Sequence, residues 1–459
     1  MCVGDTSAAS GGAGGGSRWG NWGQGGGGGG DHWGLPADGF GEGGGLHLPF
    51  AYIGKKDKIV AEVERVPGKQ RILIFMSETG GGHKASAEAI KGALEGLYGD
   101  EFEISIIDLW SKYTPWPFNQ LPKTYSFMVK HSWMWKAFWA IGEFPPTKHL
   151  LFSGSGYTIR NSLEKAFMEF NPDMIVSVHP LMQHIPLGLM KRKGLLGKLP
   201  FVTVVTDLDS CHPTWFHPDV NRCFIPSLGV VDRAHKMGLT DEQITHYGLP
   251  LRPAFSKAVL ADRGDSAKSA LRHELGLEAS KKTVLLIGGG EGMGPVAATA
   301  GEISKNLSGL PDQGQLIVIC GKNLQLKEKL EATSWPDGVS VKVEGFVDAT
   351  RMASLMSSSN VIVTKAGPGT IAEAMACSLP IVLNDFIPGQ EAGNVSFVVD
   401  SGAGTFVRDP AEVASTIGQW FSDPSLLRGF AQGAASGAKP EATYDIARDI
   451  ADIVRSYKT

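Results

Sequence analysis

Four glycine-rich loops follow predicted strands in this sequence, at 80–82, 288–294, 367–370 and 388–393. Such loops let backbone N–H groups approach a phosphate, and the N-terminus of a following helix adds a favourable dipole. None is a dinucleotide fingerprint, because 288–294 reads GGGEGMG, and none is a P-loop, because no GK[ST] follows. A single loop of this kind could be explained as a tight turn that binds nothing. Four at the carboxyl ends of strands favour a nucleotide diphosphate, with an NAD-dependent oxidoreductase as the weaker alternative.

The stretch 365–373, KAGPGTIAE, carries the most specific signal. Pro368 is expected at the start of a helix, where its missing N–H leaves nothing unsatisfied. Gly369 and Thr370 can then offer backbone N–H groups and a hydroxyl to a phosphate. Glu373 follows about one turn into that helix, where its carboxylate either pairs with a ribose diol or complements the helix dipole.

A second polar segment, 390–394, suits the hydroxyls of a sugar. It holds Gln390, Glu391 and Asn394 around Gly393, and it follows a predicted strand and a proline–glycine turn. Amide and carboxylate side chains hydrogen-bond hydroxyl groups. We therefore expect this segment to contact a sugar.

His83 directly follows the first glycine loop, at a predicted helix start. Its imidazole can act as a general base near neutral pH, although a lone histidine is more often structural. Asp207 and Asp209, at the end of the predicted strand 201–207, are rival bases or orienting groups. Each is equally explained as a capping or turn acid, so the residue that takes a proton stays open.

Aromatic and basic residues gather in the segment 110–148, which holds five of the eleven tryptophans. From Lys112 to Lys148 there are five lysines against Glu143 alone. Tryptophans interleaved with lysines fit a surface in the headgroup layer of an anionic bilayer. A domain core with a solvated basic rim explains the composition equally well. A further basic run, 191–193 with Lys198, lies in the same half.

The elements that would position these residues form two similar halves. Alternating strands and helices predict, in each half, a parallel sheet covered by helices, so we expect two Rossmann-like α/β domains facing a cleft. The predicted strands are 71–77, 102–109, 173–179, 201–207 and 222–227, then 283–287, 315–320, 339–343, 360–364 and 380–384. We expect a tail and lead-in at 1–65, domains at 66–255 and 256–435 around a polar linker near 261–265, and a C-terminal helix at 436–459 that packs back on the first domain.

Composition separates the front of the chain from its body. Of the 60 glycines in 459 residues, 20 lie in the first 50, and this predicts a disordered tail. The remaining body is nearly neutral, which argues against a nucleic-acid partner. The five cysteines are scattered, as is typical of a reducing compartment, and no apolar run is long enough to cross a membrane. Neither a secretory signal nor a clear transit peptide is recognisable, and nothing indicates an oligomeric state.

Taken together, eight motifs resemble the monogalactosyldiacylglycerol synthase family of plastids. The likeness covers roughly residues 70–455 in order. The motifs are MSETGGGHKASAE (76–88), VHPLMQH (178–184), VTDLD (205–209), HPTWFH (212–217), GLPLRP (248–253), GGGEGMGP (288–295), TKAGPGTIAE (364–373) and NDFIPGQEAGN (384–394). The family belongs with the lipid-acceptor glycosyltransferases of GT-B fold.

This resemblance implies transfer of galactose from UDP-galactose to 1,2-diacylglycerol with inversion, at a plastid envelope membrane and without a metal or cofactor. His83, or Asp207, would act as the base, Phe346 would lie near the uracil, and Glu373 would bind the ribose. The residues implied to meet the pyrophosphate are Arg252, Gly288, Gly289, Gly290, Glu291, Gly292, Pro368, Gly369 and Thr370. Those implied to read the sugar are Gln390, Glu391, Gly393 and Asn394.

The lipid acceptor also gives the aromatic segment a role. A chain without a membrane-spanning helix must extract diacylglycerol from a bilayer, so anionic lipid is an expected partner. The residues expected at the acceptor or membrane side are Trp116, Pro117, Trp133, Trp135, Lys136, Trp139 and Trp215, although Trp215 is alternatively a core residue. A lipid glycosyltransferase using UDP-glucose or another UDP-sugar is the nearest rival. A non-catalytic nucleotide-sugar-binding membrane adaptor is more distant.

Overall fold

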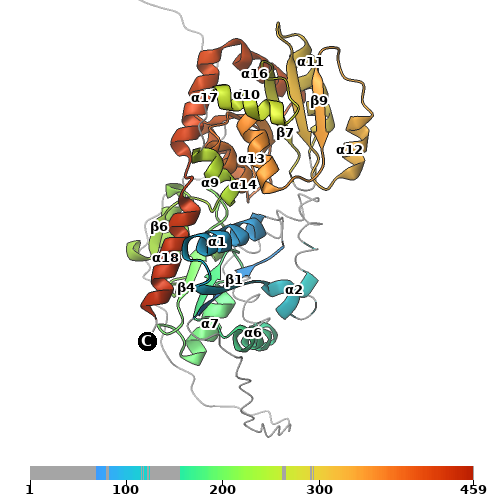
Figure 1. Ribbon diagram of the computed structural model, residues 1–459. Coiled ribbons are helices and arrows are strands. Elements are labelled where there is room, and N and C mark those ends of the chain that lie inside the picture. The colour runs from blue at the N-terminus through green and yellow to red at the C-terminus, as the bar shows by residue number, and fades with distance from the viewer. Residues whose placement is uncertain are drawn as a thin grey trace, which may run out of the picture. The chain divides into compact units, whose positions relative to one another are not determined.

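A computed structural model (Figure 1) describes much of the chain beyond residue 68. The described residues are 69–78, 82–114, 116, 118–120, 124, 156–260, 265–289, 292 and 294–457. The predicted tail, 1–65, and part of the predicted linker lie outside them.

The first sheet contains six parallel strands in the order β2-β1-β3-β4-β5-β6. They are β1 (Gln70–Met76), β2 (Phe102–Asp108), β3 (Met174–Ser177), β4 (Phe201–Val204), β5 (Arg222–Ile225) and β6 (Ile244–His246). Every residue of β1 is buried, as expected of a parallel strand covered on both faces.

Helices cover both faces of this sheet. They are α1 (Gly82–Tyr98), α2 (Leu109–Tyr113), α6 (Gly156–Phe170), α7 (His184–Lys193) and α8 (Val231–Lys236), with 3₁₀ turns η1 (Phe118–Gln120), η2 (Pro213–Trp215), η3 (Leu228–Val230) and η4 (Asp241–Gln243). Successive residues of β1 serve opposite faces. Leu73 shares a core with α6 and α7, while Ile72 shares another with α1.

The second sheet repeats this plan in the order β12-β11-β10-β7-β8-β9, again all parallel. Its strands are β7 (Lys282–Ile287), β8 (Gly314–Ile319), β9 (Ser340–Glu344), β10 (Val361–Lys365), β11 (Ile381–Asp385) and β12 (Gly404–Phe406). The chain runs outward from β7 in one direction and from β10 in the other. The β7–β10 neighbourhood is therefore the topological switch point, where α/β sheets bind ligands at the carboxyl ends of their strands.

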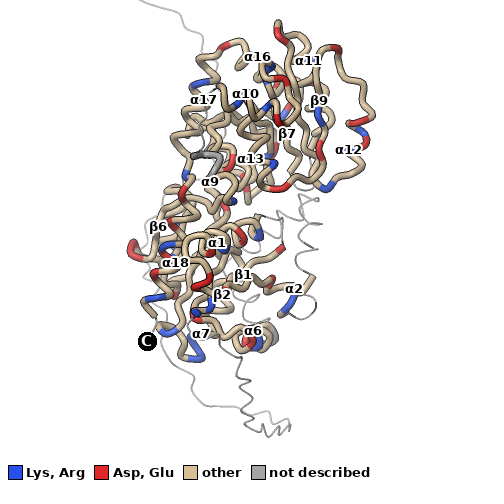
Figure 2. Tube along the Cα trace, in the orientation of Figure 1, with Lys and Arg blue, Asp and Glu red and all other residues tan. Residues whose placement is uncertain are grey.

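Helices also cover both faces of the second sheet. They are α9 (Pro253–Leu260), α10 (Asp265–Glu274), α11 (Val296–Ser308), α12 (Leu324–Glu331), α13 (Ala349–Ser358), α14 (Pro368–Ala376), α15 (Ala392–Asp400), α16 (Pro410–Ser422) and α17 (Pro424–Gly437). Charged residues of both signs are scattered over both halves, in keeping with a nearly neutral body (Figure 2). The ten predicted strands are confirmed. The three-residue strands β6 and β12 were not predicted, because they are too short to show a pattern.

The last helix, α18 (Ala442–Ser456), returns to the first sheet and lies beside α1 (Figure 1). Ala447, Ile450 and Val454 are completely buried in the same core as Ile72. Gln70 Nε2 donates a hydrogen bond to the Val454 carbonyl at 2.8 Å. The apolar face of α18 is thus the one that packs on the first half.

Candidate active site

His83 lies in the first turn of α1, immediately beyond the carboxyl end of β1. It is 9% exposed, and its Nδ1 lies 2.8 Å from Thr206 Oγ1. Burial lowers the pKa of His83 to about 4, although a hydrogen bond to the Val178 carbonyl acts in the opposite direction. The imidazole is therefore neutral at neutral pH and able to accept a proton.

Asp207 follows β4 and is also buried. Burial raises the pKa of Asp207 to about 6, while hydrogen bonds from Trp215 and Gln390 oppose the shift and the nearby charge of Glu391 adds to it. Trp215 Nε1 donates to Asp207 Oδ2 at 2.6 Å, and the Trp215 ring lies 6.0 Å from that of His83. Both candidate bases thus adjoin one tryptophan, and Gln390 of the second half hydrogen-bonds Asp207.

Trp215 was expected either at the membrane or in the core, and the membrane alternative is wrong. Its side chain is completely buried, so its ring cannot lie in a headgroup layer. It lies in η2, which His212 caps by accepting a hydrogen bond from the Thr214 N–H. The indole is therefore a support for Asp207 rather than a surface anchor.

Arg252 and Glu373 form a bidentate ion pair between the two halves. Arg252 Nε and Nη2 donate to the two carboxylate oxygens of Glu373 at 2.7 and 2.8 Å. The guanidinium also lies 5.0 Å from the centre of the Phe255 ring. Burial raises the pKa of Glu373, although its bonds with Arg252 act against that shift. The residues that the resemblance assigns to pyrophosphate and ribose contact each other.

The segment 390–394 connects the second half to the loop after β4. Asn394 Oδ1 accepts from the Asp209 N–H at 3.1 Å, and its Nδ2 donates to the Ala366 carbonyl at 2.9 Å. The Gly393 N–H donates to Ser210 Oγ. These groups, expected to read a sugar, therefore also hold two loops together.

Glu391 is nearly buried and pairs with Lys365, the last residue of β10. Its second oxygen accepts from the Ile387 N–H at 2.8 Å. Lys365 was quoted in the sequence motif but was not predicted as a site residue. Its only sequence signal is its place directly before the glycine loop.

The glycine loops of the second half lie at the switch point. Gly289 and Gly292 have φ values of +70° and +60°, which favour glycine. Gly288 is packed against Val296, because an added Cβ would lie 2.8 Å from Val296 Cγ2. Gly290 and Glu291 lie outside the described residues. Pro368 begins α14, as predicted.

The remaining predicted residues are spread more widely. A Cβ added to Gly369 would meet nothing within 4 Å, so there is open space beside this residue, and Thr370 follows it in α14. Phe346, in the loop after β9, is 70% exposed, and Trp116 is 79% exposed. The other predicted membrane residues lie outside the described part of the chain: Pro117, Trp133, Trp135, Lys136 and Trp139.

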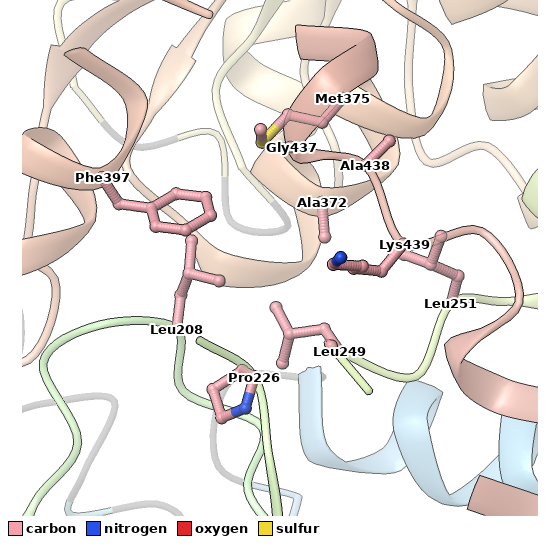
Figure 3. Close-up of a pocket in the computed structure, with 11 residues that line it drawn as sticks. Leu208, Pro226, Leu249, Leu251, Ala372, Met375, Phe397, Gly437, Ala438 and Lys439 are labelled. Atoms are coloured by element: carbon pink, nitrogen blue, oxygen red, sulfur yellow. The ribbon is translucent and has the colours of Figure 1, made fainter. Parts of the chain in front are cut away.

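An apolar crevice lies where the chain crosses between the halves (Figure 3). Leu249 and Leu251 face Ala372 and Met375 across it, and the amine end of Lys439 lies between Ala372 and Leu249. None of the predicted site residues lines it. We interpret it as part of the packed joint between the halves rather than as the site.

Neither a metal cluster nor a membrane span is found among the residues that the structure describes. Within them, no three His, Cys, Asp or Glu side chains are grouped to hold a metal ion. No described helix is both long and apolar enough to cross a membrane.

Two family models match this chain. The monogalactosyldiacylglycerol (MGDG) synthase model matches residues 83–251, and the glycosyltransferase family 28 C-terminal domain matches residues 283–417. The chain is 48% identical over 392 residues to the chloroplastic monogalactosyldiacylglycerol synthase of Spinacia oleracea, covering 84% of this chain and 73% of that protein. For synthase 1 of Arabidopsis thaliana the identity is 47%, covering 84% of this chain and 71% of the relative. The chain belongs to the monogalactosyldiacylglycerol synthase family.

Solved structures show the fold of this family member. MurG of Acinetobacter baumannii superposes with a TM-score of 0.54 at 14% identity, covering 84% of this chain and 100% of that one. A UDP-GlcNAc 2-epimerase from Neisseria meningitidis, bound to UDP-GlcNAc, gives 0.53 at 12% identity, covering 84% of this chain and 100% of its own. The predicted GT-B fold is confirmed.

Sequence reasoning missed two further neighbours of the site in this synthase-family chain. His179, just beyond β3, places its ring 4.6 Å from that of His83, edge to face. Burial holds the pKa of His179 well below its usual range, and the nearby His83 adds to this effect. Ser210 bonds the Gly393 N–H. The sequence signal that could have found His179 and Ser210 is their position, because each lies at or just beyond the carboxyl end of a predicted strand.

Replacing Gly393 by alanine is expected to destabilise the contact between the halves by about 1–3 kcal/mol, the usual cost of overpacking. The added Cβ would overlap Ser210 Oγ and lie 3.3 Å from the Ser210 nitrogen. Thermal unfolding measures the loss. Ser210→Ala/Gly393→Ala is the control, since it removes the closest atom and is expected to regain part of the stability. Equal midpoints for Gly393→Ala and wild type would contradict the close approach.

Proposed function

We propose that this protein transfers galactose from UDP-galactose to the free hydroxyl of 1,2-diacylglycerol and forms monogalactosyldiacylglycerol with inversion. The observation that carries the proposal is the 47–48% identity to curated synthases over 84% of the chain. The curated relatives are named chloroplastic, so the enzyme is assigned to the chloroplast, where it acts at a membrane surface.

Inversion needs one in-line displacement, so one base is enough. The acceptor oxygen attacks the anomeric carbon on the face opposite UDP, and its proton passes to the neutral imidazole of His83. The bond from that carbon to UDP breaks, and its electron pair stays on the departing phosphate. The N-terminus of α14 and the cations beside it offset this charge. Our proposal assigns no step to a metal or cofactor.

The product assay tests this function and its nearest rivals. The purified chain is incubated with diacylglycerol liposomes and each UDP-sugar in turn, and the glycolipid is identified by mass. A hexose adduct with UDP-galactose, and much less product with UDP-glucose or UDP-N-acetylglucosamine, is the expected result. Product with UDP-glucose alone would show that the enzyme is a glucosyltransferase and contradict the proposed donor. No product with any donor would overturn the proposed function.

We further propose that one face of the first half rests on anionic lipid. Tyr113 Oη in α2 donates to Glu169 of α6 at 2.7 Å, and Trp116, three residues after Tyr113, is exposed. The exposed residues Lys191–Lys193 end the neighbouring helix α7. Partial burial and the nearby Arg192 both lower the pKa of Arg160 on α6. Lys193 is paired with Glu164 of α6, so Arg160, Lys191 and Arg192 carry the net positive charge of this face. Clustered like charges of this kind favour an anionic partner.

Removing the basic end of α7 is expected to weaken liposome binding. Each cation near a membrane surface contributes about 1 kcal/mol, and salt screens that attraction. Lys191→Gln/Arg192→Gln/Lys193→Gln should therefore sediment less with anionic liposomes than wild type does. Lys305→Gln/Lys329→Gln/Arg428→Gln, an equal charge change on exposed helices of the second half, is the control. Equal binding by both triple variants would rule out this face.

A further inference from the structure

The side chain of Lys365 lies between two glycine loops of the second half. Lys365 ends β10, at the switch point of the sheet. A Cβ added to Gly289, after β7, would lie 3.4 Å from Lys365 Cε, and one added to Gly367 would lie 3.3 Å from its Nζ. Both neighbours lack side chains, so the ammonium lies beside exposed backbone at the place where phosphates bind in such sheets.

The buried carboxylate of Glu391 holds this ammonium in place. The Glu391 side chain is 4% exposed, whereas that of Lys365 is 24% exposed. One oxygen of Glu391 pairs with Lys365 Nζ, and the other accepts from the Ile387 N–H. The carboxylate is thus fixed inside the protein while the ammonium reaches solvent. An ammonium has three donors, so this ion pair leaves it able to bind a second anion.

Arg252, which pairs with Glu373 of α14, is a second cation to compare with Lys365, and its geometry is different. Its Nε and Nη2 both donate to Glu373, so the fork that recognises a phosphate is already engaged by a carboxylate. A diphosphate that used Arg252 in this way would first have to displace Glu373. Lys365 needs no such exchange.

We propose that Lys365 binds the diphosphate of the nucleotide-sugar donor and stabilises the charge that develops on the departing UDP, with Glu391 as the residue that positions it. This inference rests on the proposed function. It assigns to Lys365 the phosphate contact that the resemblance gives to Arg252, and it gives Glu391 a role through Lys365.

Calorimetric titration of the full chain with UDP and with uridine tests the assignment. Lys365→Gln is expected to weaken UDP binding by about tenfold to hundredfold, the range for a lost hydrogen bond to a charged group, and to leave uridine affinity unchanged. Lys365→Arg keeps the charge and should remain within a few-fold of wild type. Glu391→Gln should weaken UDP binding less than Lys365→Gln does. Lys305→Gln, which removes a distant exposed lysine paired with Glu302, is the matched control.

The possible results separate the inference from the function. If wild type binds UDP and Lys365→Gln binds it equally well, the inference is wrong and the proposed function stands. If Lys365→Gln loses UDP and uridine together, the lysine supports the fold and the inference is also wrong; the Lys365→Arg titration then shows whether charge alone restores binding. If wild type neither binds UDP nor forms product, the proposed function fails and the inference falls with it.

Discussion

Replacing His83 by alanine is expected to lower kcat by about 10²–10⁴-fold, the usual contribution of a general base. The imidazole is buried beside Thr206, and burial lowers its pKa to about 4, so it is unprotonated throughout the neutral range. Initial rates with saturating UDP-galactose and diacylglycerol liposomes measure the loss. UDP affinity, measured by calorimetry, should stay close to that of wild type, because His83 belongs to the first half.

The pH profile distinguishes His83 from Asp207 as the base. A base must be unprotonated, so activity falls on the acid side of its pKa. With His83 as the base, kcat/KM should hold from neutral pH down to about pH 5, since the pKa of His83 is about 4. With Asp207 as the base, kcat/KM should already fall near pH 6. Asp207→Asn is the matched variant: near-normal turnover in His83→Ala and none in Asp207→Asn would assign the proton to Asp207.

Replacing Arg252 by methionine is expected to destabilise the protein by about 3 kcal/mol or more at neutral pH, because it leaves a buried carboxylate unpaired. Glu373 is 8% exposed and both its oxygens accept from Arg252. The thermal midpoint, followed by calorimetry, measures the effect. The double variant Arg252→Met/Glu373→Gln removes the stranded charge and should recover a large part of the loss.

The pH dependence of this variant has a definite sign. Burial raises the pKa of Glu373 even with Arg252 present, so removing Arg252 raises it further. A carboxyl whose pKa is raised by folding favours the folded state when protonated, and this contribution is lost as pH rises through its folded pKa. The deficit of Arg252→Met should therefore shrink on acidification from pH 7 towards pH 5. A deficit independent of pH would show that packing of the guanidinium, and not its charge, supports the joint.

The strands that carry the site were predictable because parallel strands buried on both faces are continuous apolar runs. The runs that contain β1, β4, β7 and β10 are of this kind, and each ends close to a glycine, histidine, aspartate or lysine of the site. Pro368 likewise marked the start of α14, since proline suits the first helical position. These signals are local, and a local pattern is sufficient to reveal them.

The partners of those residues were not predictable. The sequence left Trp215 open between the membrane side and the core, and the structure buries it against Asp207. Gly393 appeared to be a ligand-binding glycine, yet an added Cβ would meet Ser210, which lies 183 positions earlier in the chain. Composition describes a residue type, and only packing decides which surface that residue meets.

The sequence by itself determined two parallel α/β halves, the strand ends at which chemistry gathers, and membership of the synthase family. The tertiary structure decided which charged groups are paired. Arg252 with Glu373 and Lys365 with Glu391 are joined across 121 and 26 positions. Such pairing depends on loops brought together when two sheets are built and joined, and no periodicity or spacing along the chain records it. For that reason the family and the fold were readable from the residues, whereas the different pairing of Arg252 and Lys365 emerged only from their contacts.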